Sequence, residues 1–94
     1  MRVTWSARAQ DDFTIIFRQA LDEDARYARN LVDALSKAMD RLSDYPRLGT
    51  PVGSDGHRKW RLPGTPFLIV YHAGEESLHI LRVYHERQDW STEP

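Results

Sequence analysis

The sequence predicts an α+β fold in which a helical hairpin packs on one face of a small, mostly antiparallel sheet. The stretch from Phe67 to Trp90 contains two apolar, β-branched runs separated by a polar segment with a glycine, which is typical of a β-hairpin. Between residues 7 and 44, apolar side chains recur at intervals of three and four, which indicates two amphipathic helices. One β-prone segment precedes the helices and another follows them, so the predicted element order is βααβββ.

The composition indicates one small domain over residues 1–94. The chain has no cysteine, which excludes a disulfide framework, a thiolate nucleophile and a zinc–thiolate site. The formal net charge of −1 argues against a strong, non-specific hold on nucleic acid by the whole molecule, although a local basic patch stays open. No apolar run approaches the ~20 residues that a membrane span requires, and the N-terminus lacks a signal-peptide pattern. We therefore expect a cytoplasmic protein with no membrane association.

The N-terminal half predicts a strand followed by the helical hairpin. Residues 1–5 are β-prone, with alternate side chains on opposite faces. Ser6 is a good N-cap for a helix over residues 7–21, and a short acidic turn then leads into a second, longer helix. The second helix should end near Asp44, because the proline at position 46 disfavours helical backbone at the residue before it.

The C-terminal half predicts a loop and then an antiparallel meander. Residues 46–56 are dense in Pro, Gly and Ser and are expected to form the loop. Strands are expected over residues 57–62, 67–71 and 78–84, while the edge and direction of the N-terminal strand stay open. Alternation in the last strand assigns its side chains to two faces: Leu78, Ile80, Arg82 and Tyr84 to one, and His79, Leu81 and Val83 to the other. Because both faces carry apolar residues, this strand should lie inside the sheet.

Six short patterns, in this order along nearly the whole chain, resemble the ParE branch of the RelE/ParE toxin superfamily of bacterial toxin–antitoxin systems. They are a first strand ending in W-S, a helix beginning A-x-x-D, a second helix running into L-x-x-Y-P-x-x-G (Leu42, Tyr45, Pro46, Gly49), a basic strand around Trp60-Arg61, an I-V-Y strand (Ile69 to Tyr71), and the ending I-L-R-V-x-H-x-x-x-D-W (Ile80 to His85, Asp89, Trp90). The ending is the most specific of the six.

The resemblance implies a toxin that poisons DNA gyrase, serves plasmid stabilization, and is neutralised by a ParD-like antitoxin in a toxin–antitoxin hetero-oligomer. It implies no cofactor and no metal, and we assign no catalytic residue. The residues expected to meet the target or partner lie in the basic strand and the closing segment: Arg58, Lys59, Trp60, Arg61, Arg82, His85, Arg87, Asp89 and Trp90.

Two alternatives stay open beside this hypothesis. The superfamily also contains ribosome-dependent mRNA endonucleases of the RelE type, and here the nuclease residues would be His85, Arg61, Lys59 and Arg82. Leu68 stands where those nucleases commonly carry an arginine, and Glu86 where the closest nuclease endings have a tyrosine, so their set looks incomplete. The second alternative is an inactive member that serves as a binding or regulatory module.

Several of these residues also have simpler interpretations. An arginine inside a central strand must be paired, so Arg82 should bind a carboxylate of the closing segment, with Asp89 as first candidate and Glu86 as second. Trp90 would then serve as a packing lid. An equal interpretation of the basic segment is a solvated edge strand whose charges prevent edge-to-edge pairing. The other three histidines, His57, His72 and His79, lack metal-ligand spacing and are expected to be structural.

Overall fold

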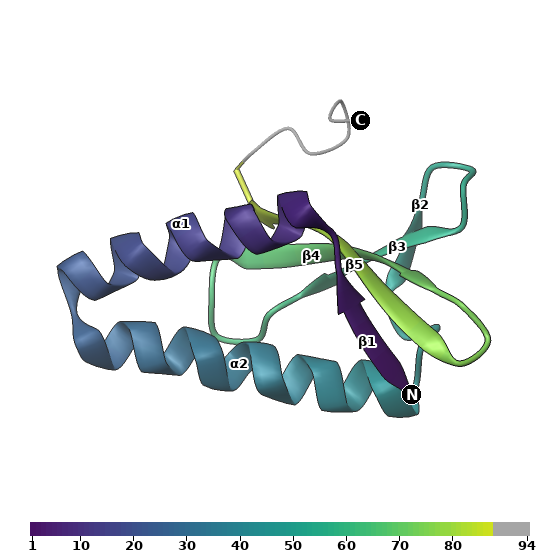
Figure 1. Ribbon diagram of the computed structural model, residues 1–94, viewed down its shortest axis with the longest axis horizontal. Helices are drawn as coiled ribbons and strands as arrows, with labels where there is room; N and C mark the ends of the chain where they lie inside the picture. Colours follow the sequence, from purple (N-terminus) through teal and green to yellow (C-terminus); the bar gives the residue numbers. More distant parts are fainter. Residues whose placement is uncertain (88–94) are drawn as a thin grey trace.

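A computed structural model describes residues 1–87 as two helices covering one face of a five-stranded sheet (Figure 1). The elements are β1 (Arg2–Trp5), α1 (Ala7–Glu23), α2 (Ala25–Asp44), β2 (Thr50–Val52), β3 (His57–Arg61), β4 (Phe67–Ala73) and β5 (Ser77–His85). The strand order is β1-β5-β4-β3-β2, and only the pairing of β1 with β5 is parallel. The predicted α+β class and mostly antiparallel sheet are confirmed.

Two caps define the helical hairpin. Ser6 Oγ accepts the Ala9 N–H at 3.0 Å and donates its own proton to the Leu81 carbonyl at 2.7 Å, so the cap of α1 is also tied to β5. Asp24 alone makes the turn between the helices, because its N–H donates to the Ala20 carbonyl while its carboxylate accepts the Arg26 N–H at 2.8 Å. Helix α1 therefore continues to Glu23, two residues beyond the predicted end, whereas α2 ends at Asp44 as predicted.

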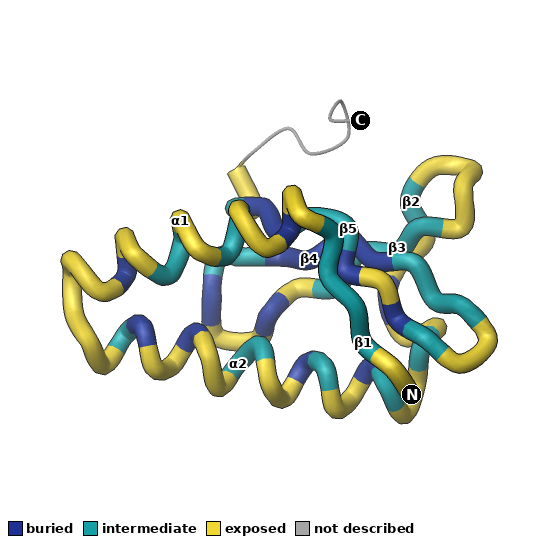
Figure 2. Tube along the Cα trace, in the orientation of Figure 1, coloured by how far each residue is buried: buried dark blue, intermediate teal, exposed yellow. Residues whose placement is uncertain are grey.

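The core lies between the helices and the facing side of the sheet. Both helices alternate buried and exposed positions along their length, and the strands β4 and β5 contain the longest buried stretches (Figure 2). The largest buried cluster joins side chains from both layers: Ala9, Ala38, Leu42, Leu62, Ile69, Tyr71, Leu78, Ile80 and Val83. Strand β1 completes this layer, because it pairs with β5 from Arg2 opposite Ser77 to Trp5 opposite Ile80. This settles the edge and the direction that the sequence left open.

A β-bulge in β5 overturns the predicted faces of that strand. Val70 pairs with Arg82 but the next residue, Tyr71, pairs with Ile80, so Leu81 has no partner in the ladder. The extra residue reverses the alternation from that point onward. Val83 therefore joins Leu78 and Ile80 on the helix side, while Arg82 and Tyr84 turn to the opposite face. Alternation alone was wrong here because it assumes an unbroken ladder.

The predicted loop over residues 46–56 contains the short strand β2, so that prediction was wrong in part. Pro51, which lowers the apparent strand propensity, lies opposite Arg58 in the ladder with β3. A proline has no N–H to donate and is tolerated in a sheet at an edge strand. Strand β2 is such an edge, so the proline that hid the strand in the sequence is compatible with its position.

A buried tyrosine fastens the segment between α2 and β2 to the sheet. The Tyr71 hydroxyl accepts the Gly49 N–H at 2.9 Å and donates to the Pro46 carbonyl at 2.7 Å. A Cβ atom on Gly49 would lie 2.6 Å from Tyr71 Oη and 2.7 Å from the Lys59 carbonyl oxygen, so only glycine fits. Arg58 Nη1 adds a hydrogen bond to the Gly49 carbonyl at 2.7 Å. These contacts join the Y-P-x-x-G pattern to the I-V-Y pattern, because the tyrosine of the second binds the proline and glycine of the first.

We expect the substitution Tyr71→Phe to lower the free energy of unfolding by about 1–3 kcal/mol, because it leaves the buried Gly49 N–H without an acceptor. The matched control is Tyr45→Phe, which removes a hydroxyl from an exposed ring and should change stability by less than about 0.5 kcal/mol. Urea unfolding of both variants measures the difference. Equal effects of the two substitutions would contradict the proposed fastening.

The same tyrosine should make stability fall in alkaline solution. Burial raises the pKa of Tyr71 above its ordinary value of 10.0, and the Gly49 hydrogen bond and the Arg58 charge oppose this only in part. Above that pH the unfolded chain loses the phenol proton while the folded chain keeps it, so stability declines as pH rises towards the folded pKa and is undiminished below about pH 10. The decline should be smaller in Tyr71→Phe when urea unfolding is repeated at increasing pH.

Candidate functional site

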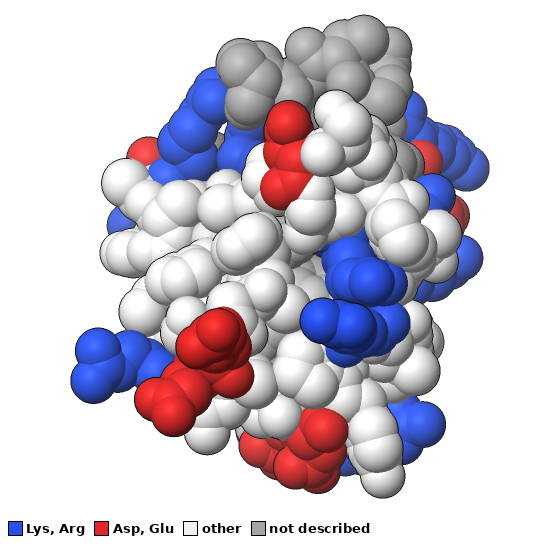
Figure 3. Space-filling model, turned by 90° about the vertical axis from the view of Figure 1, so that its right-hand side faces the viewer, with Lys and Arg blue, Asp and Glu red and all other residues white. Residues whose placement is uncertain are grey.

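The described strands carry basic but no acidic side chains, whereas the helices carry both. Within residues 1–87, every Asp and Glu lies on a helix, in a cap or in a turn, and none lies in a strand. The strands instead carry five cations: Arg2, Arg58, Lys59, Arg61 and Arg82. Figure 3, which views the end of the molecule nearest the β4–β5 turn, shows both acidic and basic groups on this side of the molecule. The overall net charge near zero therefore conceals a cationic sheet.

Four of these cations lie by register on the face of the sheet that the helices leave uncovered, called here the helix-free face: Arg2, Lys59, Arg61 and Arg82. The register places Lys59 and Arg82 on either side of Val70, and Arg61 beside Leu68. Buried apolar side chains occupy the centre of the face: Leu68, Val70 and Tyr84. The helix-free face is thus a small apolar patch bordered by Lys and Arg, which suits binding of an anionic or mixed surface.

Arg82 is held by a carboxylate from α1. Its Nε donates to Asp12 at 2.8 Å and its Nη2 donates to the second oxygen at 3.1 Å, while the Val83 N–H donates to the same carboxylate at 2.9 Å. The two side chains are only 16% and 17% exposed, and the guanidinium carbon lies 4.7 Å from the centre of the Tyr84 ring. Such a bidentate, partly buried pair is strong and directional.

The predicted partners of Arg82 require a correction. Glu86, the second candidate, instead binds Arg61 at 2.7 Å in a pair whose side chains are 63% and 39% exposed. Asp89, the first candidate, lies outside the described residues. Asp12 was missed because, two turns into α1, it looked like an ordinary helix carboxylate near the positive end of the helix dipole. Its place in the A-x-x-D pattern was the available signal.

His85 lies on the helix side of the sheet, on the face opposite Lys59 and Arg61. It pairs with Phe67 across β4 and β5, and the two rings meet edge to face with centres 5.4 Å apart. Its Nδ1 accepts the Arg87 N–H at 3.1 Å. It also lines a cleft of about 330 Å³ together with residues of α1 and the sheet: Asp12, Ile15, Ile16, Gln19, Phe67 and Val83. Lys59 and Arg61 therefore lie on the face opposite His85, whereas Asp12, the partner of Arg82, lines the same cleft as His85.

The remaining predicted site residues have mixed positions. Arg58 and Trp60 alternate with Lys59 and point to the helix side of β3, where Arg58 binds backbone carbonyls and Trp60 packs against the core. The Trp60 indole N–H is buried without a hydrogen-bond partner in residues 1–87. Arg87 is exposed in the turn after β5, and Trp90, like Asp89, lies beyond the described part of the chain.

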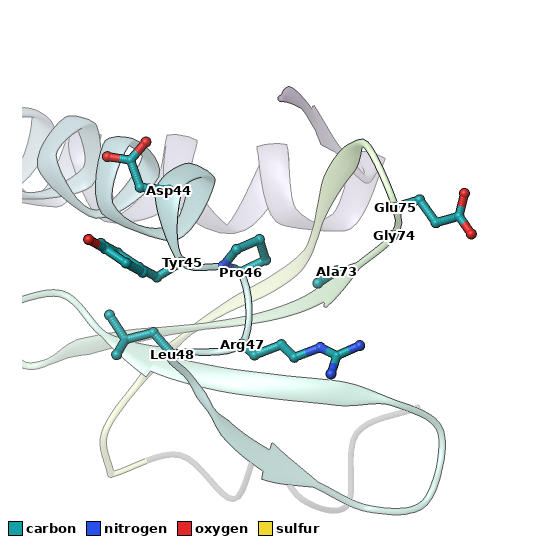
Figure 4. Close-up of a pocket in the computed structure, with 8 residues that line it drawn as sticks. All are labelled: Asp44, Tyr45, Pro46, Arg47, Leu48, Ala73, Gly74 and Glu75. Carbon is teal, nitrogen blue, oxygen red and sulfur yellow. The ribbon is translucent and has the colours of Figure 1, made fainter.

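A second hollow, of about 760 Å³, lies between the segment after α2 and the β4–β5 turn (Figure 4). Arg47 and Glu75 extend along opposite sides of it, while Tyr45 and Leu48 point away from the turn. Tyr45 and Leu48 are exposed, and neither was among the residues expected to meet a target or partner. The hollow offers apolar surface with charges at its rim.

Within residues 1–87, no group of three or more His, Cys, Asp or Glu side chains is arranged to hold a metal ion. In the same range, no helix combines the length and the apolar character that a membrane crossing requires.

Comparison with known proteins identifies similar sequences. The model of a family described as the ParE toxin of the type II toxin–antitoxin system parDE matches residues 3–90. A protein of Sinorhizobium fredii named Y4kP, itself only suspected to be a toxin, is 29% identical over 89 residues, which cover 95% of this chain and 92% of that protein.

Solved structures share the fold at low identity. The chromosomal ParDE system from P. aeruginosa contains a chain with a TM-score of 0.74 and 20% identity, covering 90% of this chain and 95% of that one. The isolated E. coli RelE toxin gives a TM-score of 0.63 at 17% identity, covering 94% of this chain and 87% of RelE. The E. coli RelBE toxin–antitoxin complex gives 0.64 at 15% identity, covering 93% and 98%. At these identities the likeness concerns the fold alone.

A double-mutant cycle should separate the two ion pairs. Combining Asp12→Ala with Arg82→Ala should give a coupling energy of about 1.5–3 kcal/mol, because the pair is mostly buried and bidentate. The control cycle, Arg61→Ala with Glu86→Ala, should give less than about 1 kcal/mol, because that pair is largely exposed. Both are read from urea unfolding. Coupling energies of the same size would refute the special role of Asp12.

Proposed function

Because the chain belongs to the ParE toxin family and is a type II toxin of the RelE/ParE superfamily, we propose that its target is DNA gyrase and that a ParD-like antitoxin holds it inactive. The observation that carries the choice of target is the division of the charged residues between two faces of the sheet. Lys59 and Arg61 lie on the helix-free face, and His85 lies on the helix side.

This division argues against RNA cleavage by the chain. Cleavage by a neighbouring 2′-hydroxyl requires a base, cations for the phosphate and a proton donor around one phosphorus atom. Here the register puts Lys59 and Arg61 on the face opposite His85, and Leu68 supplies no charge. Arg61 and Arg82 also already have carboxylate partners. The arrangement suits binding to a macromolecule better than acid–base catalysis.

The helix-free face is the proposed contact with gyrase. Arginine is enriched at the energetic centres of protein interfaces, and cationic borders steer association with acidic surfaces. Asp12 and Glu86 hold Arg82 and Arg61 in defined orientations, which reduces the entropy lost when these side chains bind. Gyrase acts on cytoplasmic DNA, so the proposal also puts the protein in the cytoplasm.

The helical hairpin is the proposed contact with the antitoxin. Three large apolar side chains on the two helices are exposed: Ile15, Leu21 and Val32, at 57%, 47% and 44%. Ile15 also lines the cleft beside His85. An amphipathic helix that covers such residues gains binding energy from apolar burial. The proposed assembly is therefore a hetero-oligomer in which the antitoxin covers the hairpin.

The lysines of the chain provide a matched pair for testing the target. Lys59 lies on the helix-free face and Lys37, the only other lysine, is exposed on α2. The purified chain should inhibit supercoiling by gyrase, and Lys59→Ala should weaken inhibition about tenfold, as loss of an interfacial charge does, whereas Lys37→Ala should not. A supercoiling assay over a range of toxin concentrations measures both.

The nuclease alternative gives a different result in a parallel assay. Translating ribosomes incubated with the chain should show no new mRNA ends. Codon-dependent cleavage that disappears in His85→Ala, together with unaffected gyrase, would replace the proposed function with an RNA-cleaving one.

An antitoxin that binds only the folded toxin should raise its melting temperature. At a concentration 1,000 times its dissociation constant it adds about 4 kcal/mol to the stability of the toxin. Ile15→Glu should reduce this effect by placing a charge in the covered surface, while Thr14→Glu, at the neighbouring exposed position, should not. Thermal melts of each variant with the antitoxin test the hairpin as the contact. Equal stabilisation of both variants would place the antitoxin elsewhere.

A further inference from the structure

Three histidines lie side by side across the helix-free face. His57 of β3 pairs with His72 of β4, and His72 pairs with His79 of β5. The first two rings meet edge to face with centres 6.2 Å apart, and the second two are nearly parallel with centres 6.3 Å apart. Thr4 of β1 lies opposite His79 and continues the row. This histidine row, defined as His57, His72 and His79, therefore crosses three neighbouring strands.

The partners of His79 accommodate either charge state of its ring. Its Nδ1 contacts the Thr4 hydroxyl and its Nε2 contacts the Ser77 hydroxyl at 3.1 Å. A hydroxyl can both donate and accept a hydrogen bond. It can therefore bind a neutral ring in either tautomer or accept a hydrogen bond from the N–H of a charged ring. His79 is exposed, and His57 and His72 are half-buried, so solvent and ligands reach the row.

The surroundings of the row are cationic. The charged side chains that share its face are Arg2 on β1, Lys59 and Arg61 on β3, and Arg82 on β5. No strand of the described chain contributes a carboxylate to it. The acidic residues at its ends belong to turns: Asp55 between β2 and β3, and Glu75 and Glu76 between β4 and β5. Because imidazole is the side chain that mild acidification protonates, a lower pH adds positive charge to this face.

We propose that the histidine row is a proton-dependent binding site for single-stranded nucleic acid. The rings offer planar surfaces on which unpaired bases stack, and the protonated rings, with Lys59 and Arg2 beside them, offer contacts for phosphates. From β3 to β1 the strip crosses three strand spacings, or about 15 Å, which is long enough for several nucleotides. An acidic peptide matches the charges but makes no use of the rings.

This activity goes beyond the proposed function, because it requires neither gyrase nor the antitoxin. It also reconciles a net charge of −1 with nucleic-acid binding, since the acidic side chains lie on the helices and turns. Binding should be weaker at pH 8 than at pH 6, because acidification protonates imidazole. Each phosphate contact on a single strand contributes about −0.7 to the slope of log K against log salt, so each ring that gains a phosphate contact should steepen that slope by about that amount.

The test measures binding of a fluorescent oligothymidylate to the chain by anisotropy, at pH 6 and pH 8 and between 50 and 200 mM salt. We expect affinity at 50 mM salt to rise on the order of tenfold from pH 8 to pH 6, with the steeper salt slope. The triple variant His57→Gln, His72→Gln, His79→Gln should lose both changes although His85 remains. The variant His57→Arg, His79→Arg should already bind at pH 8 as the original chain does at pH 6.

Competition and folding controls make each outcome decisive. Circular dichroism and thermal melts at both pH values establish that each variant is folded, and the exposed single variant His79→Gln, expected to lose about a third of the slope change, replaces the triple variant if that one unfolds. A pH dependence that survives these substitutions would overturn the proposal. Binding of polyglutamate as tight as that of the oligonucleotide would also overturn it, because the rings would then contribute nothing.

Discussion

The carboxylate of Asp12 joins α1 to β5 at a place where β5 has no neighbouring strand on that side. Strand β1 pairs with β5 only as far as Ile80. Further along β5, the N–H of Val83 therefore has no neighbouring strand on that side to bind. Asp12 accepts that N–H and, through the same group, both the Nε and Nη2 of Arg82. A buried donor without an acceptor costs about 1–3 kcal/mol, so α1 here replaces a missing strand. The orientation of Arg82 depends on it.

The bulge at Leu81 and the Ser6 cap belong to the same arrangement. Ser6 donates to the Leu81 carbonyl, while its N–H donates to the Ile80 carbonyl at 2.9 Å, so the chain leaves β1 and enters α1 directly beside the bulge. The reversal of faces that follows brings Val83 into the core and Arg82 and Tyr84 onto the helix-free face. The cationic character of that face is therefore a product of one extra residue in β5.

Local signals explain which features could be predicted from the sequence. Caps, helix periodicity and the glycine-containing turn depend on neighbouring residues, so Ser6, the end of α2 at Asp44 and the β4–β5 hairpin were confirmed. The faces predicted for Arg82 and Tyr84 were wrong, because contacts between distant segments decide where a bulge forms. The Asp12–Arg82 pair spans 70 positions and leaves no periodic trace in the sequence. Strand β2 was missed because Pro51 is read as a loop residue unless the edge position is known.

The pairing of the first strand with the last has a consequence for synthesis of the protein. Residues 2 to 5 find their partners only at residues 77 to 80, so the sheet cannot close until nearly the whole chain has left the ribosome. Contacts between such distant segments also slow folding, because the intervening loop must be closed first. The helical hairpin, whose contacts are local, can form much earlier. The two helices of a growing chain therefore form before its cationic face does. A partner that binds the hairpin can bind earlier than any target of the sheet.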